Sequence, residues 1–153
     1  MLMRVDLLKS PHRPWFMSLG LKFAKWRVGA FPGPPLTISY KPAFFQKDFI
    51  SYIVRGMAGS GGWTKGEAEL FASFVSKLNQ CEFWLTAHAA VAALHLPQET
   101  LDAVLDDWTT ADVLAKTRGA LELLEVMTLH PQDITPEFIQ KIKSYGLDDI
   151  AIQ

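Results

Sequence analysis

The strongest constraint on the fold is a helix-start signal at Thr64, which is followed by apolar residues at helical spacing. Thr64 and Glu67 have the spacing of a capping box, in which each side chain accepts a hydrogen bond from the other residue's backbone N–H. The apolar residues that follow recur every three or four positions: Leu70, Phe71, Phe74, Val75 and Leu78. A second helix-compatible run extends over 81–94. The sequence therefore predicts a helical hairpin or one bent helix over 64–94.

Three more helices are predicted beyond this segment, over 98–106, 110–129 and 136–145. Pro97 and Pro136 suit a first helical turn, where a backbone N–H has no partner in the helix. Thr110 and Thr135 suit the capping position. No stretch alternates apolar and polar residues over a useful length, so we expect no strands. The pattern predicts an all-α protein with about five to seven helices.

The chain ahead of Thr64 divides at a proline-rich segment. FPGPP at 31–35 predicts a loop, and an apolar-faced helix is predicted from Pro42 to about Tyr52. At 153 residues, the length is that of a single domain. We therefore expect an N-terminal basic and aromatic arm with its loop at 1–35, and one helical domain at 36–153.

The first thirty residues are strongly basic and aromatic. Their only acid is Asp6. Their basic residues are Arg4, Lys9, Arg13, Lys22, Lys25 and Arg27. This composition is typical of a membrane-surface anchor, a transit peptide or a segment that docks on a partner. An arm that packs on its own domain or on a neighbouring subunit is the interpretation we prefer.

The overall composition excludes several classes of function. A net charge of -1 gives no electrostatic case for nucleic acid as a partner. A single cysteine excludes an intrachain disulfide framework and suits a reducing cytoplasm. The apolar runs are too short for a membrane span, and the order of a secretory signal is missing. We expect a soluble cytoplasmic protein without stable membrane insertion.

The single cysteine, Cys81, lies at a predicted helix start, seven residues before His88. The unpaired N–H groups of a first helical turn favour a thiolate. On a helix, Cys81, Trp84 and His88 would share one face. Glu69 lies twelve residues before Cys81 on the preceding helix, and a bend between the two helices would return its carboxylate to the same space. These three groups make a plausible proton relay.

These residues give the chain a resemblance to the superfamily of alkylhydroperoxidase AhpD and carboxymuconolactone decarboxylase. Redox members of that superfamily carry a glutamate followed by S-x-x-N-x-C-x-x-C-x-x-x-H. The matching residues are Glu69, Ser76, Asn79, Cys81 and His88. Trp84 stands in place of the second cysteine, and Phe83 stands where some of the peroxidases have an additional histidine. Outside this core motif, a looser resemblance extends from residue 42 to the C-terminus.

The resemblance implies an AhpD-like helical bundle that assembles into dimers, trimers or hexamers. It also implies one more helix after the segment at 146–153, where this sequence ends. We expect no cofactor. We expect no metal either, since one cysteine with scattered His and Glu lacks the spacing of a ligand set.

The leading function that the resemblance implies is reduction of hydroperoxides by a thiol, as in peroxiredoxins. Cys81 would attack the peroxide, while His88 and Glu69 move protons. Because Trp84 replaces the second cysteine, an external thiol reductant would have to resolve the oxidised Cys81. Trp84 and Phe83 are candidates for binding a small-molecule substrate.

Two other functions remain open. A decarboxylase-like enzyme would use Glu69 and His88 as acid and base, with Cys81 incidental. An anionic substrate would then need a cation, and the core segment offers only Lys77. The second alternative is a non-catalytic oligomeric helical protein that binds a partner.

Overall fold

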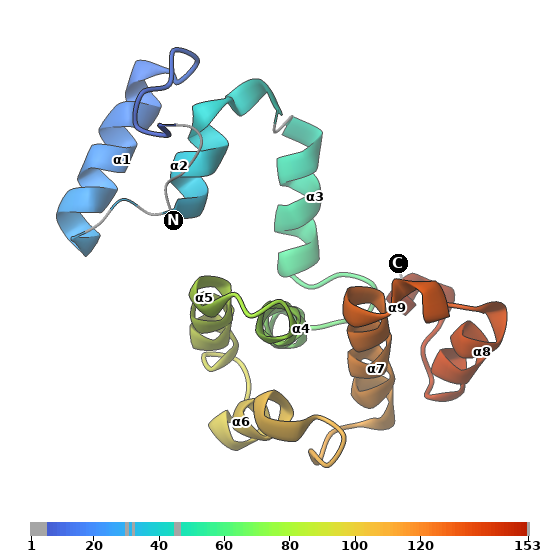
Figure 1. Cartoon of the computed structure of the whole chain (residues 1–153). Coiled ribbons are helices and arrows are strands. Elements are labelled where there is room, and N and C mark those ends of the chain that lie inside the picture. The colour runs from blue at the N-terminus through green and yellow to red at the C-terminus, as the bar shows by residue number, and fades with distance from the viewer. Residues whose placement is uncertain (1–5, 30, 32, 45–46, 153) are drawn as a thin grey trace. The chain divides into compact units, whose positions relative to one another are not determined.

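The computed structural model describes residues 6–29, 31, 33–44 and 47–152 of the chain. Within these ranges the regular structure is helical and no strand occurs, which confirms the expected all-α class (Figure 1). The α-helices are α1 (Trp15–Val28), α2 (Gly33–Tyr40), α3 (Lys47–Met57), α4 (Lys65–Leu78), α5 (Glu82–Ala92), α6 (Gln98–Asp107), α7 (Ala115–Leu129), α8 (Pro136–Ser144) and α9 (Asp149–Ile152). Short 3₁₀ turns lie at Pro42–Phe44 and Pro131–Asp133. The sequence pattern therefore undercounted the helices of the described ranges.

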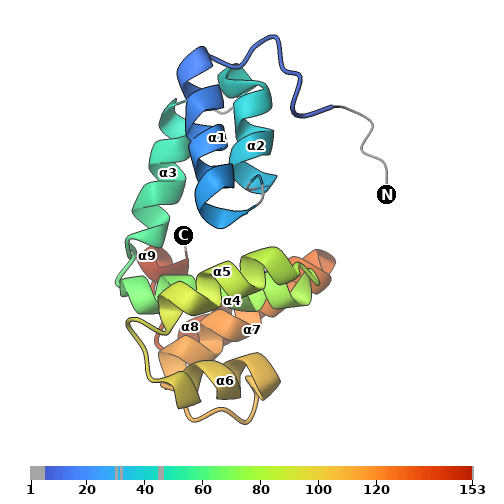
Figure 2. The ribbon, with the colours of Figure 1, turned by 90° about the vertical axis from the view of Figure 1, so that its left-hand side faces the viewer.

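Residue contacts divide the chain into two compact units, 1–53 and 54–153. The division falls inside α3. In the first unit α1 and α2 pack side by side (Figures 1 and 2). The boundary that the sequence predicts between residues 35 and 36 lies within α2 and stays a prediction.

Two predictions for the first unit need correction. The loop expected at 31–35 is wrong from Gly33 onward, because α2 begins there. Its two prolines stand in the first turn, where a helix tolerates them. The helix expected from Pro42 to Tyr52 is instead a 3₁₀ turn followed by α3, and residues 45 and 46 between them lie outside the described residues. An acidic residue, Asp48, stands in the first turn of α3 and favours a start there.

The capping box at Thr64 is confirmed. The Glu67 N–H donates to Thr64 Oγ1 at 3.2 Å, and the Thr64 N–H donates to Glu67 Oε2 at 2.8 Å. Behind this start, α4 packs lengthwise against α5, so the hairpin and not the bent helix is the observed form (Figure 2). Gly66 lets the α4 backbone approach the loop after α5, since a Cβ there would lie 2.9 Å from His95 Cβ.

A buried apolar cluster joins α4 to α5, α6 and α7. Its buried members are Leu70, Phe74, Ala92, Leu101, Val104, Ala111 and Leu121. A second cluster fixes α8 and the segment after it on α7, with Ala120, Leu123, Ile142 and Leu147 buried. Packing in this cluster fixes α4 and α5 relative to each other. It thereby also fixes the side chains that lie between the two helices.

The remaining helix boundaries are mostly as predicted. Thr135 caps α8 by accepting from the Phe138 N–H at 3.2 Å. Pro97 is the residue just before α6 and not part of its first turn. Thr110 does not start α7, which begins at Ala115. Its hydroxyl instead donates to the carbonyl and carboxylate of Asp107, because a local turn after α6 takes up that stretch.

None of the helices in the described ranges has the length and apolarity that crossing a bilayer requires.

Candidate functional site

The turn between α4 and α5 sets the geometry of the candidate site. The Cys81 N–H donates to the Ser76 carbonyl at 2.9 Å, and the Gln80 N–H donates to the Lys77 carbonyl at 2.9 Å. These two bonds form a Schellman motif, with Gln80 in the left-handed region at φ 54°. The amide of Asn79 donates to the Val75 carbonyl at 3.0 Å. Asn79 therefore caps the end of α4 with its side chain, whereas Ser76 takes part in the turn only through its backbone carbonyl.

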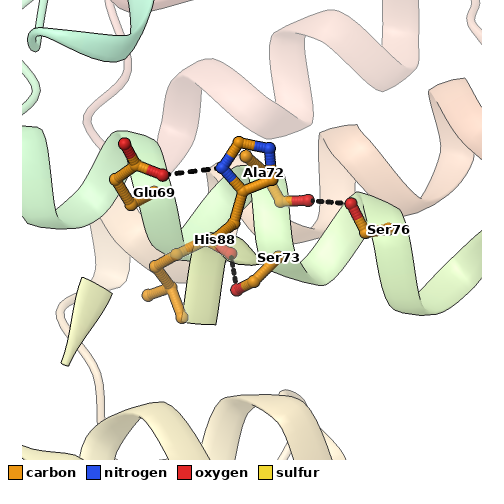
Figure 3. A network of polar contacts seen from close by, with 6 residues as sticks. Glu69, Ala72, Ser73, Ser76 and His88 are labelled. Carbon is orange, nitrogen blue, oxygen red and sulfur yellow. Dashed lines mark hydrogen bonds and ion pairs between the residues drawn. The ribbon is translucent and has the colours of Figure 1, made fainter. Parts of the chain in front are cut away.

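The hairpin brings Glu69 of α4 against His88 of α5 (Figure 3). His88 Nδ1 lies 2.7 Å from Glu69 Oε2. Glu69 is buried, with 7% of its surface exposed, while 22% of the His88 side chain is exposed. An ionised carboxylate can only accept hydrogen bonds, so Nδ1 carries the hydrogen in this pair and a neutral imidazole keeps its lone pair on Nε2.

An aromatic stack covers one face of the His88 imidazole. The Trp84 ring stacks on it with centroids 5.2 Å apart and planes 19° apart. Phe83 meets Trp84 edge to face, with centroids 5.3 Å apart. Both aromatic residues remain partly exposed. The imidazole is thus fixed by Glu69 at one edge and by Trp84 on one face, and among the described residues its Nε2 has no hydrogen-bond partner.

A pocket of about 500 Å³ opens beside this pair. Its lining is largely apolar, from Gly56, Met57, Ser60, Trp63, Ala68, Phe71, Ala72, Val75, Ser76, Trp84, His88 and Leu124. Among the described residues that line it, His88 is the one titratable side chain. The Ser76 hydroxyl donates to the Ala72 carbonyl of its own helix at 2.7 Å (Figure 3). The pocket therefore presents an oriented imidazole in apolar surroundings.

Cys81 lies apart from this pocket. It is the capping residue of α5 and not a first-turn residue, because the Schellman motif uses its N–H to end α4. Of the three residues that were predicted to share one face, Trp84 and His88 are in contact in the structure. Cys81 is half-buried, does not line the pocket and makes no side-chain capping bond to α5. The geometry brings Glu69, His88 and Trp84 together and leaves the thiol at the helix start.

Lys77 points to a different part of the fold. Its ammonium donates to the carbonyls of Leu105 and Asp106 at the end of α6. Cations suit that position, because the last carbonyls of a helix lack partners within the helix. No lysine or arginine occurs among the described residues that line the pocket. Nor do the described residues contain a group of three or more His, Cys, Asp or Glu side chains placed to hold a metal ion.

Several pocket residues carry no signal in the sequence. Met57, Trp63 and Leu124 come from the end of α3, the loop before α4 and the middle of α7. Trp63 is fixed there, since its Nε1 donates to the Ala151 carbonyl at 3.0 Å and its ring meets Phe71 edge to face. Only packing joins these segments, so no spacing rule along the chain could have grouped them.

The fold has counterparts among solved structures. One is the "alkylhydroperoxidase AhpD core: uncharacterized peroxidase-related protein" from Ralstonia eutropha, with 23% identity and a TM-score of 0.70, covering 97% of this chain and 80% of the other. The chain has the AhpD fold. An uncharacterized peroxidase-related protein from Silicibacter sp. also shares this AhpD fold, with 22% identity and a TM-score of 0.73 over 97% of this chain and 78% of that one. The sequence matches no protein-family model and no curated protein.

Proposed function

We propose that this AhpD-fold protein reduces organic hydroperoxides with Cys81 as the nucleophile and an external thiol as the reductant. The observation that carries the proposal is the 2.7 Å contact between Glu69 and His88 on the hairpin whose second helix begins next to Cys81. An imidazole oriented by a buried carboxylate is a common device for moving a proton beside a nucleophile. The peroxidase-related names of the structural neighbours agree with this reaction class.

The proposed reaction balances without a bound cofactor. The Cys81 thiolate attacks the terminal oxygen of the hydroperoxide, the O–O bond breaks, and the products are a sulfenic acid and an alkoxide. His88 Nε2 first takes up the proton that the Cys81 thiol loses on becoming a thiolate, and it then passes this proton to the alkoxide, which becomes an alcohol. One external thiol then converts the sulfenic acid to a mixed disulfide and water. A second thiol releases Cys81 and forms the external disulfide.

The distance along α5 requires a bridge in this scheme. Seven residues of helix separate Cys81 from His88 by roughly 10 Å along the axis. The ring of Trp84 occupies the turn between them and stacks on the imidazole. A water molecule or the substrate would therefore carry the proton, as in other sites where base and nucleophile do not touch.

The test is the oxidation of Cys81 by cumene hydroperoxide, followed by trapping of the sulfenic acid and mass spectrometry. Wild-type protein is expected to form the adduct and to consume hydroperoxide when dithiothreitol is present. Cys81→Ser should abolish both, and His88→Asn should slow oxidation by about 10²-fold. His95→Asn, at an exposed histidine, is the matched control. Full hydroperoxide consumption by Cys81→Ser would disprove the proposal.

A second candidate is acid/base chemistry of the decarboxylase type. One observation favours it, namely that His88 lines the pocket while Cys81 does not. Against it, Lys77 is bound at α6, so the cation expected for an anionic substrate does not line the pocket. This candidate predicts that Cys81→Ser keeps full activity and that His88→Asn loses it. A pocket that binds ligands while both variants behave as wild type would instead support the non-catalytic binding function.

A further inference from the structure

One face of α1 carries large apolar side chains that are exposed to solvent. They are Trp15 (79% exposed), Phe16 (56%), Leu19 (61%), Phe23 (62%) and Trp26 (76%). At 3.6 residues per turn these five positions fall within an arc of about 100° around the helix. We call this arc the aromatic face. A contiguous apolar patch that is exposed to solvent is typical of a binding site.

The opposite side of α1 is already used within its own unit. Leu21 is buried, and Met17 and Ala24 lie beside it in an apolar groove that α2 completes with Pro35 and Ile38. Among the described residues of its own unit, α1 therefore packs through one side and leaves the aromatic face exposed. Because both sides are apolar, burial against α2 alone does not explain the composition of the helix.

Basic residues border the aromatic face on both sides. By helical position, Lys22 lies at one edge and Arg27 lies at the other. The helix contains no aspartate or glutamate, and in the described residues neither cation forms an ion pair. By contrast, Arg13 ahead of the helix is bound internally, donating to Ser39 Oγ at 3.0 Å. The face therefore combines exposed aromatic rings with uncompensated positive charge.

We propose that the aromatic face of α1 binds the surface of membranes that contain anionic lipids. A helix with aromatic residues on one face and cations at its borders lies in the interface plane, with the rings among the acyl chains and the cations at the headgroups. Indole rings prefer this depth because they pair an apolar body with an N–H donor, and the face has one near each end of the helix. Docking in this way needs no membrane-spanning helix.

Charge favours this occupant over a second copy of the chain. A symmetric dimer through the aromatic face places α1 against α1, and the helix has no acidic residue to meet Lys22 or Arg27 of the partner copy. Anionic headgroups supply the missing negative charge next to both cations. A lipid surface satisfies both the apolar and the basic parts of the face.

The test is sedimentation of the full chain with phosphatidylcholine vesicles, with and without phosphatidylserine. We expect binding only to the anionic vesicles, and weaker binding as salt is raised. Each cation near such a surface contributes about a fivefold change in affinity, so Lys22→Glu with Arg27→Glu should weaken binding by about 25-fold or more. Trp15→Ser with Trp26→Ser should weaken binding to the anionic vesicles to a degree similar to that of the charge reversals.

Matched controls lie in the unit 54–153. Lys65→Glu reverses an exposed charge there, and Leu94→Ser removes a side chain that is 77% exposed. Both should bind like wild type, and circular dichroism should be unchanged in all variants. Equal sedimentation with both kinds of vesicle would overturn the proposal. So would α1 variants that keep vesicle binding but change from dimer to monomer in gel filtration, since the face would then be an interface between copies.

Discussion

His88 Nδ1 on α5 lies 2.7 Å from Glu69 Oε2 on α4, so the hairpin couples an imidazole to a buried carboxylate. The partners are nineteen residues apart, and their contact depends on the Schellman turn that reverses the chain before Cys81. With Nδ1 held by Glu69, the other ring nitrogen is the one that can act on a substrate. This contact is the basis of the first prediction.

Glu69→Gln is expected to slow the oxidation of Cys81 by cumene hydroperoxide about tenfold or more. The amide keeps the size of the carboxylate, but its NH₂ group can face the imidazole and favour the opposite tautomer, which leaves the wrong nitrogen free. The rate of sulfenic acid formation in a stopped-flow experiment measures the effect. ¹⁵N chemical shifts of the His88 ring report the tautomer directly.

Glu67→Gln, in the same helix, is the control for loss of a carboxylate away from the imidazole. It should leave both the oxidation rate and the His88 shifts unchanged. If Glu69→Gln changes the tautomer but not the rate, His88 does not take part in the reaction of Cys81.

Trp84→Cys is expected to form a disulfide with Cys81. Capping and third helical positions place their Cα atoms about 5 Å apart, which is within the range of disulfides. Oxidised protein should lose the mass of two hydrogens and show no free thiol. Trp84→Ser, which removes the same ring without adding a thiol, should keep Cys81 free. Two persistent thiols in oxidised Trp84→Cys would show that this turn departs from a C-x-x-C geometry.

Thr64→Ala is expected to lower the free energy of unfolding by about 1 kcal/mol. It removes the oxygen that accepts the Glu67 N–H and so opens the capping box at the start of α4. Urea denaturation followed by circular dichroism measures the loss. Thr64→Ser keeps the oxygen and should stay near wild type. An equal loss in both variants would point to the methyl group and not to the cap.

Asp107→Asn is expected to destabilise the protein at neutral pH and to have less effect in acid. The hydroxyl and N–H of Thr109 both donate to this carboxylate and lower the pKa of Asp107. A pKa that is lower in the folded state adds stability above the unfolded value, and that stability is lost as the pH falls through the folded value. The difference from wild type should therefore shrink below about pH 4.

Thermal unfolding at a series of pH values measures this dependence. Asp106→Asn is the matched control. The Asp106 carboxylate is exposed and adjacent in sequence, but it accepts none of the hydrogen bonds from Thr109 or Thr110. A gap between Asp107→Asn and wild type that stays constant from neutral to acidic pH would contradict the assigned cause.

The sequence by itself determined the helical class and the capped starts of α4 and α8. Thr64 and Thr135 were readable because capping hydrogen bonds join residues only a few positions apart. Local signals also misled, because prolines at the start of α2 resembled a loop and Thr110 resembled a cap. In both cases a short pattern fitted two local structures, and packing selected one.

Only the tertiary structure decided which of the motif residues meet. The spacing of Cys81, Trp84 and His88 suggested a single face, but the turn uses the Cys81 backbone to end α4 and leaves its thiol outside the pocket. Glu69 meets His88, and Lys77 turns to α6, because of how whole helices pack. Contacts between helices depend on the shapes of both partners, and that information is spread over segments that no local pattern connects.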